Sequence, residues 1–332
     1  AAGRRRGSGA SMIVTVTINP SVDRTIQLPS RLERDAVLRA SAVTSQAAGK
    51  GVNVSRALAH ASIPTRAIVR ADYHDPYVRE LVESGLAVVT VDPGATVRTN
   101  ISLAEPDGTT TKINEPGSPL SAAAVAALHD VVAAEAPRAS WLVLAGSLPP
   151  GADVELLADL ARTARIAAPD IRIAVDTSGA PLAALRAAGA RIDLIKPNIE
   201  ELAELTGSDP AALGTPEAVA SACAALRTDG IAAVLATLGA AGAVLASAEG
   251  AWHATHPPVI ARSTVGAGDS SLAGYLIADA EGLSPAARLA CAVAYGSAAV
   301  SLPGTTIPRP SDTRPDQVTV TEIHLPATVT AP

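Results

Sequence analysis

A glycine-rich segment ends in a carboxylate and opens directly into a stretch of helical composition. It contains Gly266, Ala267, Gly268 and Asp269, and the helical run starts at Ser270. Glycines at the start of a helix let backbone N–H groups converge on an anion, which the positive end of the helix dipole already favours. We therefore predict that residues 266–268 bind a phosphoryl group and that Asp269 accepts the proton of an attacking hydroxyl. The alternative is an ordinary Asp helix cap.

A second glycine-containing segment, around Lys50, also opens a helix. Lysine is rare in this chain, at three of 26 basic residues. Because lysine is a compact point charge and arginine a planar fork, a chain that favours arginine keeps lysine mainly where the chemistry prevents the exchange. Gly49, Lys50 and Asn53 lack the spacing of a P-loop or a dinucleotide fingerprint, and suit binding of a phosphate or of sugar hydroxyls. A plain turn is the alternative.

Three polar residues follow a short apolar run at residues 193–195, which we predict to be a strand. They are Lys196, Asn198 and Glu201. In an open α/β sheet, ligands bind at the carboxyl ends of the strands, which is where these residues fall. Asn198 and Glu201 could direct oxygens at a hydrated magnesium ion, which keeps several waters and takes few protein ligands. The alternative is a helix cap followed by an acidic first turn.

Two stretches rich in Thr and Arg, residues 25–46 and 98–114, alternate polar and apolar residues and have no helical pattern. They predict antiparallel strands outside the main sheet, forming a small lid with its strands within residues 24–46 and 97–115. Arg98 and Lys112 in this lid could hold a substrate phosphate, although exposed charges are often merely solvated. Asp23, just before the lid, could accept hydrogen bonds from sugar hydroxyls or serve as a turn residue.

The rest of the chain must form elements that bring these residues together. Short β-branched runs occur at residues 13–18, 67–69, 87–91, 141–145, 171–175, 193–195 and 232–236, and segments of helical length at 51–61, 121–136, 154–164 and 216–227. This alternation predicts an α/β fold with a mainly parallel central sheet and helices on both faces. After residue 239 we predict a hairpin (243–246 and 251–254), two helices (268–281 and 285–302) and an edge strand (318–323).

The composition bounds the class of protein. A net charge of -6, with the basic cluster confined to residues 4–6, argues against a nucleic-acid partner. Residues 1–11 have the composition of a disordered leader without the apolar region of a signal peptide, and no later run reaches the roughly 18 apolar residues of a membrane span. We expect a cytoplasmic protein without a membrane partner, with a single domain over residues 12–332.

Taken in chain order, these segments resemble the PfkB (ribokinase-like) carbohydrate kinase family, and within it the branch of 1-phosphofructokinases and tagatose-6-phosphate kinases. The resemblance is carried by residues 15–23, 47–55, 98–100, 145–151, 196–201, 237–239 and 263–270. It implies a ribokinase-like fold, ATP and Mg²⁺ as cofactors, and a homodimer formed through the lid sheets. It also implies that Asp269 is the catalytic base and that Gly266, Ala267 and Gly268 form the anion hole.

The same resemblance assigns the remaining site residues to two sides of one cavity. It places Asp23, Gly49, Lys50, Asn53, Arg98, Lys112 and Ser147 at the phosphosugar. It places Lys196, Asn198, Glu201, Thr237 and Gly239 at ATP, with Glu201 and Asn198 reaching the metal through water. The chain departs from the family pattern at residues 70–76, where a Gly-Gly loop is common, and at Val97. Both departures bear on substrate specificity.

The implied activity is transfer of the γ-phosphoryl of ATP to the 6-hydroxyl of fructose 1-phosphate. Tagatose-6-phosphate kinase and 6-phosphofructokinase activities are the alternatives, because their substrates also carry a phosphate for Arg98 and Lys112 to hold. An NAD-dependent oxidoreductase is disfavoured because no GxGxxG segment follows the first strand. A catalytically inactive sugar-phosphate sensor is disfavoured because Asp269 and its preceding glycines are present.

Overall fold

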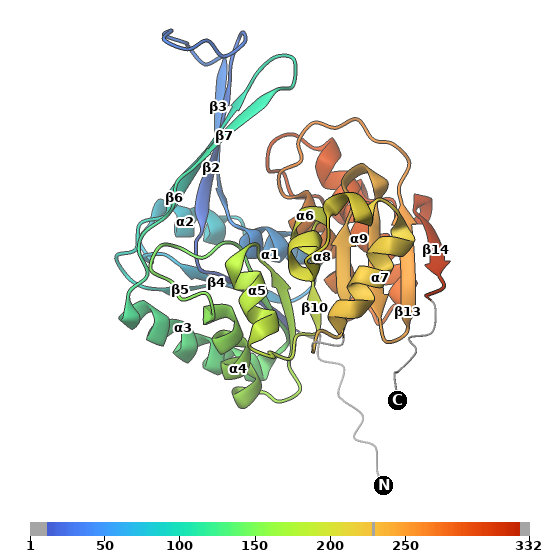
Figure 1. Ribbon diagram of the computed structural model, residues 1–332. Coiled ribbons are helices and arrows are strands. Elements are labelled where there is room, and N and C mark those ends of the chain that lie inside the picture. The colour runs from blue at the N-terminus through green and yellow to red at the C-terminus, as the bar shows by residue number, and fades with distance from the viewer. Residues whose placement is uncertain (1–11, 228–229, 326–332) are drawn as a thin grey trace.

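The computed structural model describes residues 12–227 and 230–325, and the predicted leader lies outside this part of the chain. Within the described residues, ten strands form one central sheet (Figure 1). In spatial order they are β14 (Thr319–Ile323), β13 (Gly250–Thr255), β12 (Ala243–Ser247), β11 (Val234–Thr237), β10 (Leu194–Ile195), β9 (Arg172–Asp176), β8 (Ala139–Ala145), β1 (Met12–Thr17), β4 (Thr65–Arg70) and β5 (Val88–Val91). Strands β11 to β5 pair in parallel, whereas β12, β13 and β14 are antiparallel. The predicted, mainly parallel α/β fold is confirmed.

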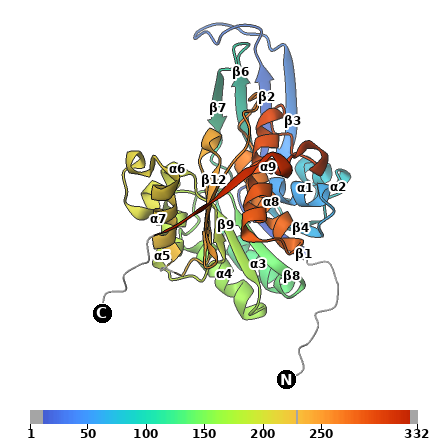
Figure 2. The same ribbon diagram turned by 90° about the vertical axis from the view of Figure 1, so that its right-hand side faces the viewer.

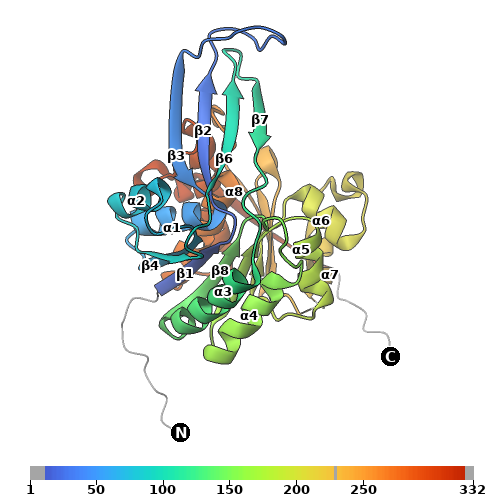
Figure 3. The same ribbon diagram turned by 90° about the vertical axis from the view of Figure 1, so that its left-hand side faces the viewer.

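Helices cover both faces of this sheet, as Figures 2 and 3 show from opposite sides. One face carries α1 (Lys50–His60), α2 (Pro76–Glu83), α8 (Ala267–Ala280) and α9 (Pro285–Ser301). The other carries α3 (Ala122–Glu135), α4 (Leu156–Ala167), α5 (Ala180–Ala187), α6 (Ile199–Thr206) and α7 (Pro216–Arg227). Because both sheet faces are covered, the central strands are apolar at nearly every position rather than at alternate ones.

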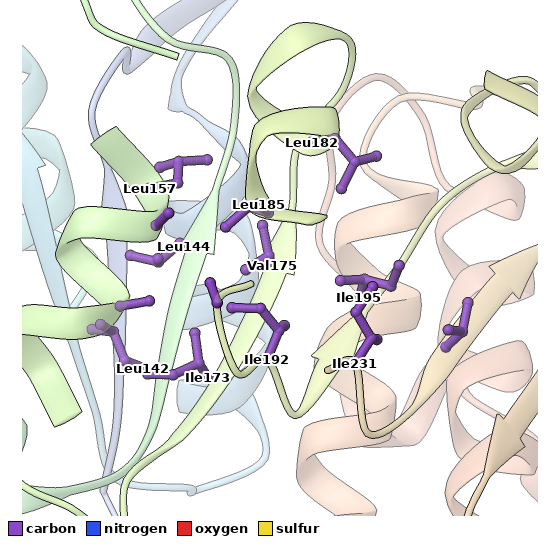
Figure 4. Close-up of a cluster of buried hydrophobic side chains, with 14 of the residues drawn as sticks. Leu142, Leu144, Leu157, Ile173, Val175, Leu182, Leu185, Ile192, Ile195 and Ile231 are labelled. Atoms are coloured by element: carbon purple, nitrogen blue, oxygen red, sulfur yellow. The ribbon is translucent and has the colours of Figure 1, made fainter. Parts of the chain in front are cut away.

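Strand β8 illustrates how the two cores form. Leu142 and Leu144 point to the face of α4 and α5, whereas Trp141 and Val143 point to the face of α8 and α9. Figure 4 shows the first of these cores, in which strand residues such as Ile173 meet leucines of α4 and α5. Each fully buried side chain of this size contributes about 1.5–3 kcal/mol. The sheet is therefore a rigid platform for the residues at its carboxyl edge.

Helices α8 and α9 pack unusually closely through two glycines. A Cβ atom at Gly274 would lie 2.5 Å from the carbonyl oxygen of Cys291, and one at Gly296 would lie 2.7 Å from Oγ of Ser271. Only glycine allows this approach without displacing the partner helix. The contact fixes α8, whose first turn carries Asp269.

A separate four-stranded sheet rises from the body as the lid (Figures 1 and 3). Its order is β3 (Ala42–Ala48), β2 (Ser21–Gln27), β6 (Arg98–Ala104) and β7 (Thr110–Asn114). Strand β2 begins before the predicted limit of residue 24, and β3 continues past residue 46. The prediction of wholly antiparallel pairing is wrong, because β2 and β6 are parallel. Each follows a strand of the parallel central sheet, β1 and β5, so both leave the sheet in the same direction.

The two faces of the lid differ in polarity. Directly paired residues share a face, so Asp23, Gln46 and Asn100 lie on one side of the lid. Ile26, Val43 and Leu103 share the other face with Ile101 and Ile113. Val43 and Ile113 are 46% and 54% exposed, respectively. The lid thus presents a polar face and a mainly apolar face, which also carries Arg24 opposite Ile101 and stays partly open to solvent.

Two short helices, α2 and α5, are not among the predicted elements. Helix α2 begins after Asp75, whose side chain accepts a hydrogen bond from the backbone N–H of Tyr77, with Pro76 at the first helical position. Its eight residues are too few for a helical periodicity to stand out in the sequence. None of the helices in the described part of the chain has the length and apolar character needed to cross a bilayer.

Candidate active site

Most of the residues predicted from the sequence converge on one cavity of about 450 Å³, between the base of the lid and the carboxyl ends of the parallel strands. Its lining includes Asn19, Ser21, Asp23, Gly49, Lys50, Asn53, Arg98, Asn100, Ser147, Asp176, Lys196, Asn198, Glu201, Thr237, Gly266, Gly268 and Asp269. A larger hollow of about 800 Å³ lies beside α5 and α6 but contains none of the predicted residues. We place the candidate active site in the smaller cavity because the ionisable and hydrogen-bonding groups gather there.

The first turn of α8 contains both the predicted anion-binding backbone and the predicted base. Gly266 caps the helix with a φ angle of 76°, a left-handed conformation that favours glycine. Asp269, in the first turn, is only 6% exposed. Its Oδ2 accepts a hydrogen bond of 2.8 Å from Nδ2 of Asn53, which lies in α1. This hydrogen bond thus joins α1 to the first turn of α8 through residues 216 positions apart in the chain.

The carboxyl group of Asp269 is poised to exchange a proton near neutral pH. Burial raises its pKa to about 6, and the negative charge of Asp176 acts in the same direction. The ammonium groups of Lys50 and Lys196 and the hydrogen bond from Asn53 act against this rise. A carboxyl group with such a pKa is ionised for the most part at pH 7 and is a stronger base than an ordinary aspartate.

Sequence reasoning missed one residue at the centre of the cavity, Asp176. Lys50 Nζ lies 2.9 Å from its Oδ1, and Lys196 Nζ lies 3.3 Å from its Oδ2. Burial disfavours the charge of Asp176, but the ammonium groups of Lys196 and Lys50 outweigh it and lower the pKa. Asp176 is the last residue of β9, so the rule that directs attention to the carboxyl ends of strands could have found it.

At the base of the lid, Asp23 and Arg98 form a second group of polar residues. Oδ1 of Asp23 accepts hydrogen bonds from Ser21 Oγ at 2.9 Å and from Asn100 Nδ2 at 3.0 Å. Burial raises the pKa of Asp23 above its ordinary value, despite these two bonds. Arg98 donates to the carbonyl oxygen of Glu115 at 2.8 Å, and its second terminal nitrogen lies 3.5 Å from Oγ of Ser147.

On the opposite side, Asn198 and Glu201 form the helix cap that was the alternative interpretation. The backbone N–H of Asn198 donates to Glu201 Oε2 at 2.9 Å, and that of Glu201 donates to Asn198 Oδ1 at 2.8 Å. Both residues nevertheless line the cavity. The cap uses one carboxylate oxygen of Glu201 and fixes the orientation of the other.

Three predicted residues are not part of the cavity wall. Lys112 is exposed on β7, further along the lid, although its register opposite Ser102 puts it on the polar face. Gly239 begins a turn just beyond Thr237, and Ala267 is the first residue of α8. The other predicted site residues all line the cavity.

Comparisons with known proteins agree with this geometry. The chain matches the pfkB family of carbohydrate kinases over residues 16–312. It is 36% identical over 321 residues to the 1-phosphofructokinase of Rhodobacter capsulatus, covering 95% of this chain and 98% of that protein. It is 33% identical over 306 residues to the ATP-dependent 6-phosphofructokinase isozyme 2 of Escherichia coli strain K12, covering 91% and 96%.

A solved structure extends the likeness to three dimensions. The crystal structure of phosphofructokinase-2 from Escherichia coli in complex with potassium matches with a TM-score of 0.83 and 32% sequence identity, over 91% of this chain and 96% of that chain. The fold, the order of the motifs and the sequence identity therefore lead to one conclusion: the chain belongs to the pfkB family of carbohydrate kinases.

Proposed function

We propose that this protein transfers the γ-phosphoryl group of ATP to the 6-hydroxyl of fructose 1-phosphate, giving fructose 1,6-bisphosphate and ADP. The observation that carries the proposal is the buried carboxylate of Asp269, beside an anion-binding helix entrance and at the junction of the two sides of the cavity. The 1-phosphofructokinase of Rhodobacter capsulatus, similar over nearly its whole length, supports the choice of substrate.

Asp269 would act as the base of the reaction. The oxygen of the sugar hydroxyl attacks the γ-phosphorus, the bond from that phosphorus to the leaving oxygen of ADP breaks, and the hydroxyl proton passes to Asp269. Because Asn53 occupies one carboxylate oxygen, the other is the one that would accept this proton. Catalysis of this kind depends mainly on positioning and charge stabilisation.

The sugar phosphate would bind between Asp23, Arg98, Lys50 and Ser147. Several buried polar atoms in this region have no hydrogen-bond partner among the described residues: Oδ1 of Asn53, Oδ1 of Asn100 and Nε of Arg98. Such atoms are costly unless a ligand or water satisfies them, and the two acceptors suit sugar hydroxyls. Gly49 would keep the backbone close to the sugar, and Lys112 would add positive charge from the lid.

The nucleotide would occupy the other side, near Lys196, Thr237 and the turn at Gly239. The donor set fits a magnesium ion, because Glu201 lines the cavity with one carboxylate oxygen outside the helix cap. Asn198, whose amide oxygen already serves that cap, would act only through water. The ion would neutralise charge on the transferring phosphoryl group. Gly266, Ala267 and Gly268 would receive the same charge with backbone N–H groups.

Fructose 6-phosphate is the second candidate acceptor, because the Escherichia coli isozyme with 33% identity is named as a 6-phosphofructokinase. A coupled assay of ADP release would compare fructose 1-phosphate, fructose 6-phosphate, tagatose 6-phosphate and free fructose. We expect the highest kcat/KM with fructose 1-phosphate. A higher kcat/KM with fructose 6-phosphate would make that sugar the substrate in place of fructose 1-phosphate. A preference for free fructose would refute the phosphosugar site altogether.

We also infer that two copies associate through the lids. The support is the apolar face of the lid, where Ile26, Val43, Ile101, Leu103 and Ile113 share one side and Val43 and Ile113 are exposed. A solvent-facing apolar sheet surface of this kind is typical of an interface. The polar face would remain free to close over the sugar.

A further inference from the structure

Asp176 lies where the sugar side and the nucleotide side of the cavity meet. It ends β9, and its side chain is 1% exposed. The two lysines that contact it come from different elements, Lys50 from the start of α1 and Lys196 from the segment after β10. One carboxylate therefore joins three separate parts of the fold at a single point.

The two ammonium groups are placed differently with respect to the cavity. A Cβ atom at Gly268 would lie 3.0 Å from Lys196 Nζ, so this ammonium group lies against the anion-binding entrance of α8. The side chain of Lys50 is 37% exposed and lines the sugar side. An ammonium group has three N–H donors. Lys50 gives one of them to Oδ1 of Asp176 at 2.9 Å, whereas the contact of Lys196 with Oδ2 is an ion pair without a hydrogen bond. The others are available to an anion between the two lysines.

We propose that Asp176 is a positioning residue whose carboxylate holds Lys50 and Lys196 side by side. This inference rests on the proposed function. In this arrangement Lys50 meets the transferring phosphoryl group from the sugar side, and Lys196 meets it from the nucleotide side. Two flexible side chains of like charge would otherwise separate. Charge that is already in place when the transition state forms contributes most to phosphoryl transfer.

A purely structural role is the competing explanation, because a buried carboxylate between two cations also stabilises a fold. The surroundings of Asp269 separate the two explanations. The groups that face Asp269 are Lys50 and Asn53 from α1, Asp176 from β9, and Lys196 from the segment after β10. After burial, Asp176 is the largest cause that raises the pKa of Asp269. We therefore expect loss of its charge to lower the pKa of Asp269, a change in the pH profile that destabilisation of the fold alone would not give.

The first test uses the protein without nucleotide or sugar. The sequence contains three lysines, so an NMR spectrum of ¹⁵N-lysine ammonium groups has at most three signals, assignable with single Lys→Arg variants. Exposed Lys112 is the internal reference. We expect the ammonium hydrogens of Lys50 and Lys196 to exchange at least about tenfold more slowly than those of Lys112, and to lose this protection in Asp176→Asn. Equal exchange in the wild type and the variant would overturn the inference.

The second test is kinetic. In Asp176→Asn we expect kcat to fall by a factor of about ten or more with a smaller change in KM, and the acid limb of the pH profile to move to lower pH. Asp193→Asn is the matched control, since Asp193 pairs with Arg165 at the other end of the sheet. A kcat within about twofold of wild type with an unmoved midpoint would overturn the inference.

If Asp176→Asn does not fold, Asp176→Glu takes its place, because it keeps the charge but displaces the carboxylate by one methylene. We expect the midpoint of the acid limb of its pH profile to stay near that of the wild type while kcat falls. A wild-type kcat would contradict the positioning role.

Failure of the proposed function is a distinct outcome: the wild type would then phosphorylate none of the phosphosugars, whatever the lysine exchange shows. An active wild type with an unaltered Asp176→Asn would reject only the role of Asp176.

Discussion

Replacement of Asn53 by Ala should move the acid limb of the pH profile to higher pH. The bond from Asn53 Nδ2 to Asp269 Oδ2, 2.8 Å long, stabilises the ionised base. A hydrogen bond to a charged group is worth about 1.5–3 kcal/mol, and one pKa unit corresponds to about 1.36 kcal/mol. Water entering the space left by the amide would return part of this energy. We therefore expect an increase of roughly one unit from the wild-type pKa of about 6.

The sign follows from the active form, which is the ionised carboxylate. A higher pKa means that activity disappears at a higher pH as the solution is acidified. At pH 6.5, a base with a pKa of 6 is roughly three-quarters ionised, and one with a pKa of 7 roughly one-quarter. The variant should therefore lose about a further factor of three at this pH, beyond any loss that is independent of pH.

The assay is kcat/KM for fructose 1-phosphate between pH 5 and 9, because this ratio reports groups of the free enzyme. Asn100→Ala is the control: it removes a cavity amide that contacts Asp23 and Ser21 but not Asp269. We expect it to lower the plateau without moving the midpoint. A midpoint in Asn53→Ala that is unchanged, or lower than in the wild type, would refute the assignment of Asp269 as the titrating base.

Three further outcomes are expected. Asp269→Asn should reduce kcat by about 10²–10⁴-fold while calorimetry shows nearly unchanged nucleotide affinity; wild-type turnover would remove the base assignment. Ile113→Arg, on the exposed apolar face of the lid, should convert a dimer to a monomer in analytical ultracentrifugation, whereas a dimer that persists would place the interface elsewhere. Gly274→Ala should lower the free energy of unfolding by about 1–3 kcal/mol, because the new Cβ would collide with the carbonyl oxygen of Cys291. Gly214→Ala is the control, since its Cβ would lie 3.4 Å from the nearest atom, the carbonyl oxygen of Ala211. Equal effects of the two substitutions on Tm would argue against close packing of α8 on α9.

Much of the fold was predictable because its central strands are continuous apolar runs and its longer helices have clear lengths and boundaries. The hairpin of β12 and β13 follows from two further short apolar runs, and the edge strand β14 from its alternation of polar and apolar residues. The parallel pairing of β2 and β6 could not be predicted, because alternation specifies which side chains share a face and not the direction of the neighbouring strand. Helix α2 depends on the cap at Asp75 more than on its own periodicity.

The residues of the candidate site were predictable where a rare residue type or the spacing of glycines marked them. Lys50 and Lys196 were found because lysine is scarce, and Asp269 because of its glycines. Asp176 has no such mark: aspartate is common, and only the folded chain brings it, at the end of β9, between two lysines distant in the sequence. For Asn198 and Glu201 the sequence left two roles open, a helix cap and a magnesium site. The structure shows the reciprocal helix cap, and both residues also line the cavity.

The lid joins the body of the protein at the cavity, and its strands extend away from that junction. Strand β2 carries Asp23, β3 is followed directly by Gly49 and Lys50, and β6 begins with Arg98. The groups that would touch the sugar therefore lie at the junction of the lid with the body, and the far ends of the lid strands lie well away from them. Seven residues of β3 span roughly 23 Å, so a rotation of about 5° at the base displaces the far end by about 2 Å. If two lids are joined by their apolar faces, a small adjustment to the sugar in one subunit becomes a larger displacement that the second subunit must follow. Saturation curves for the sugar should then depart from simple hyperbolas.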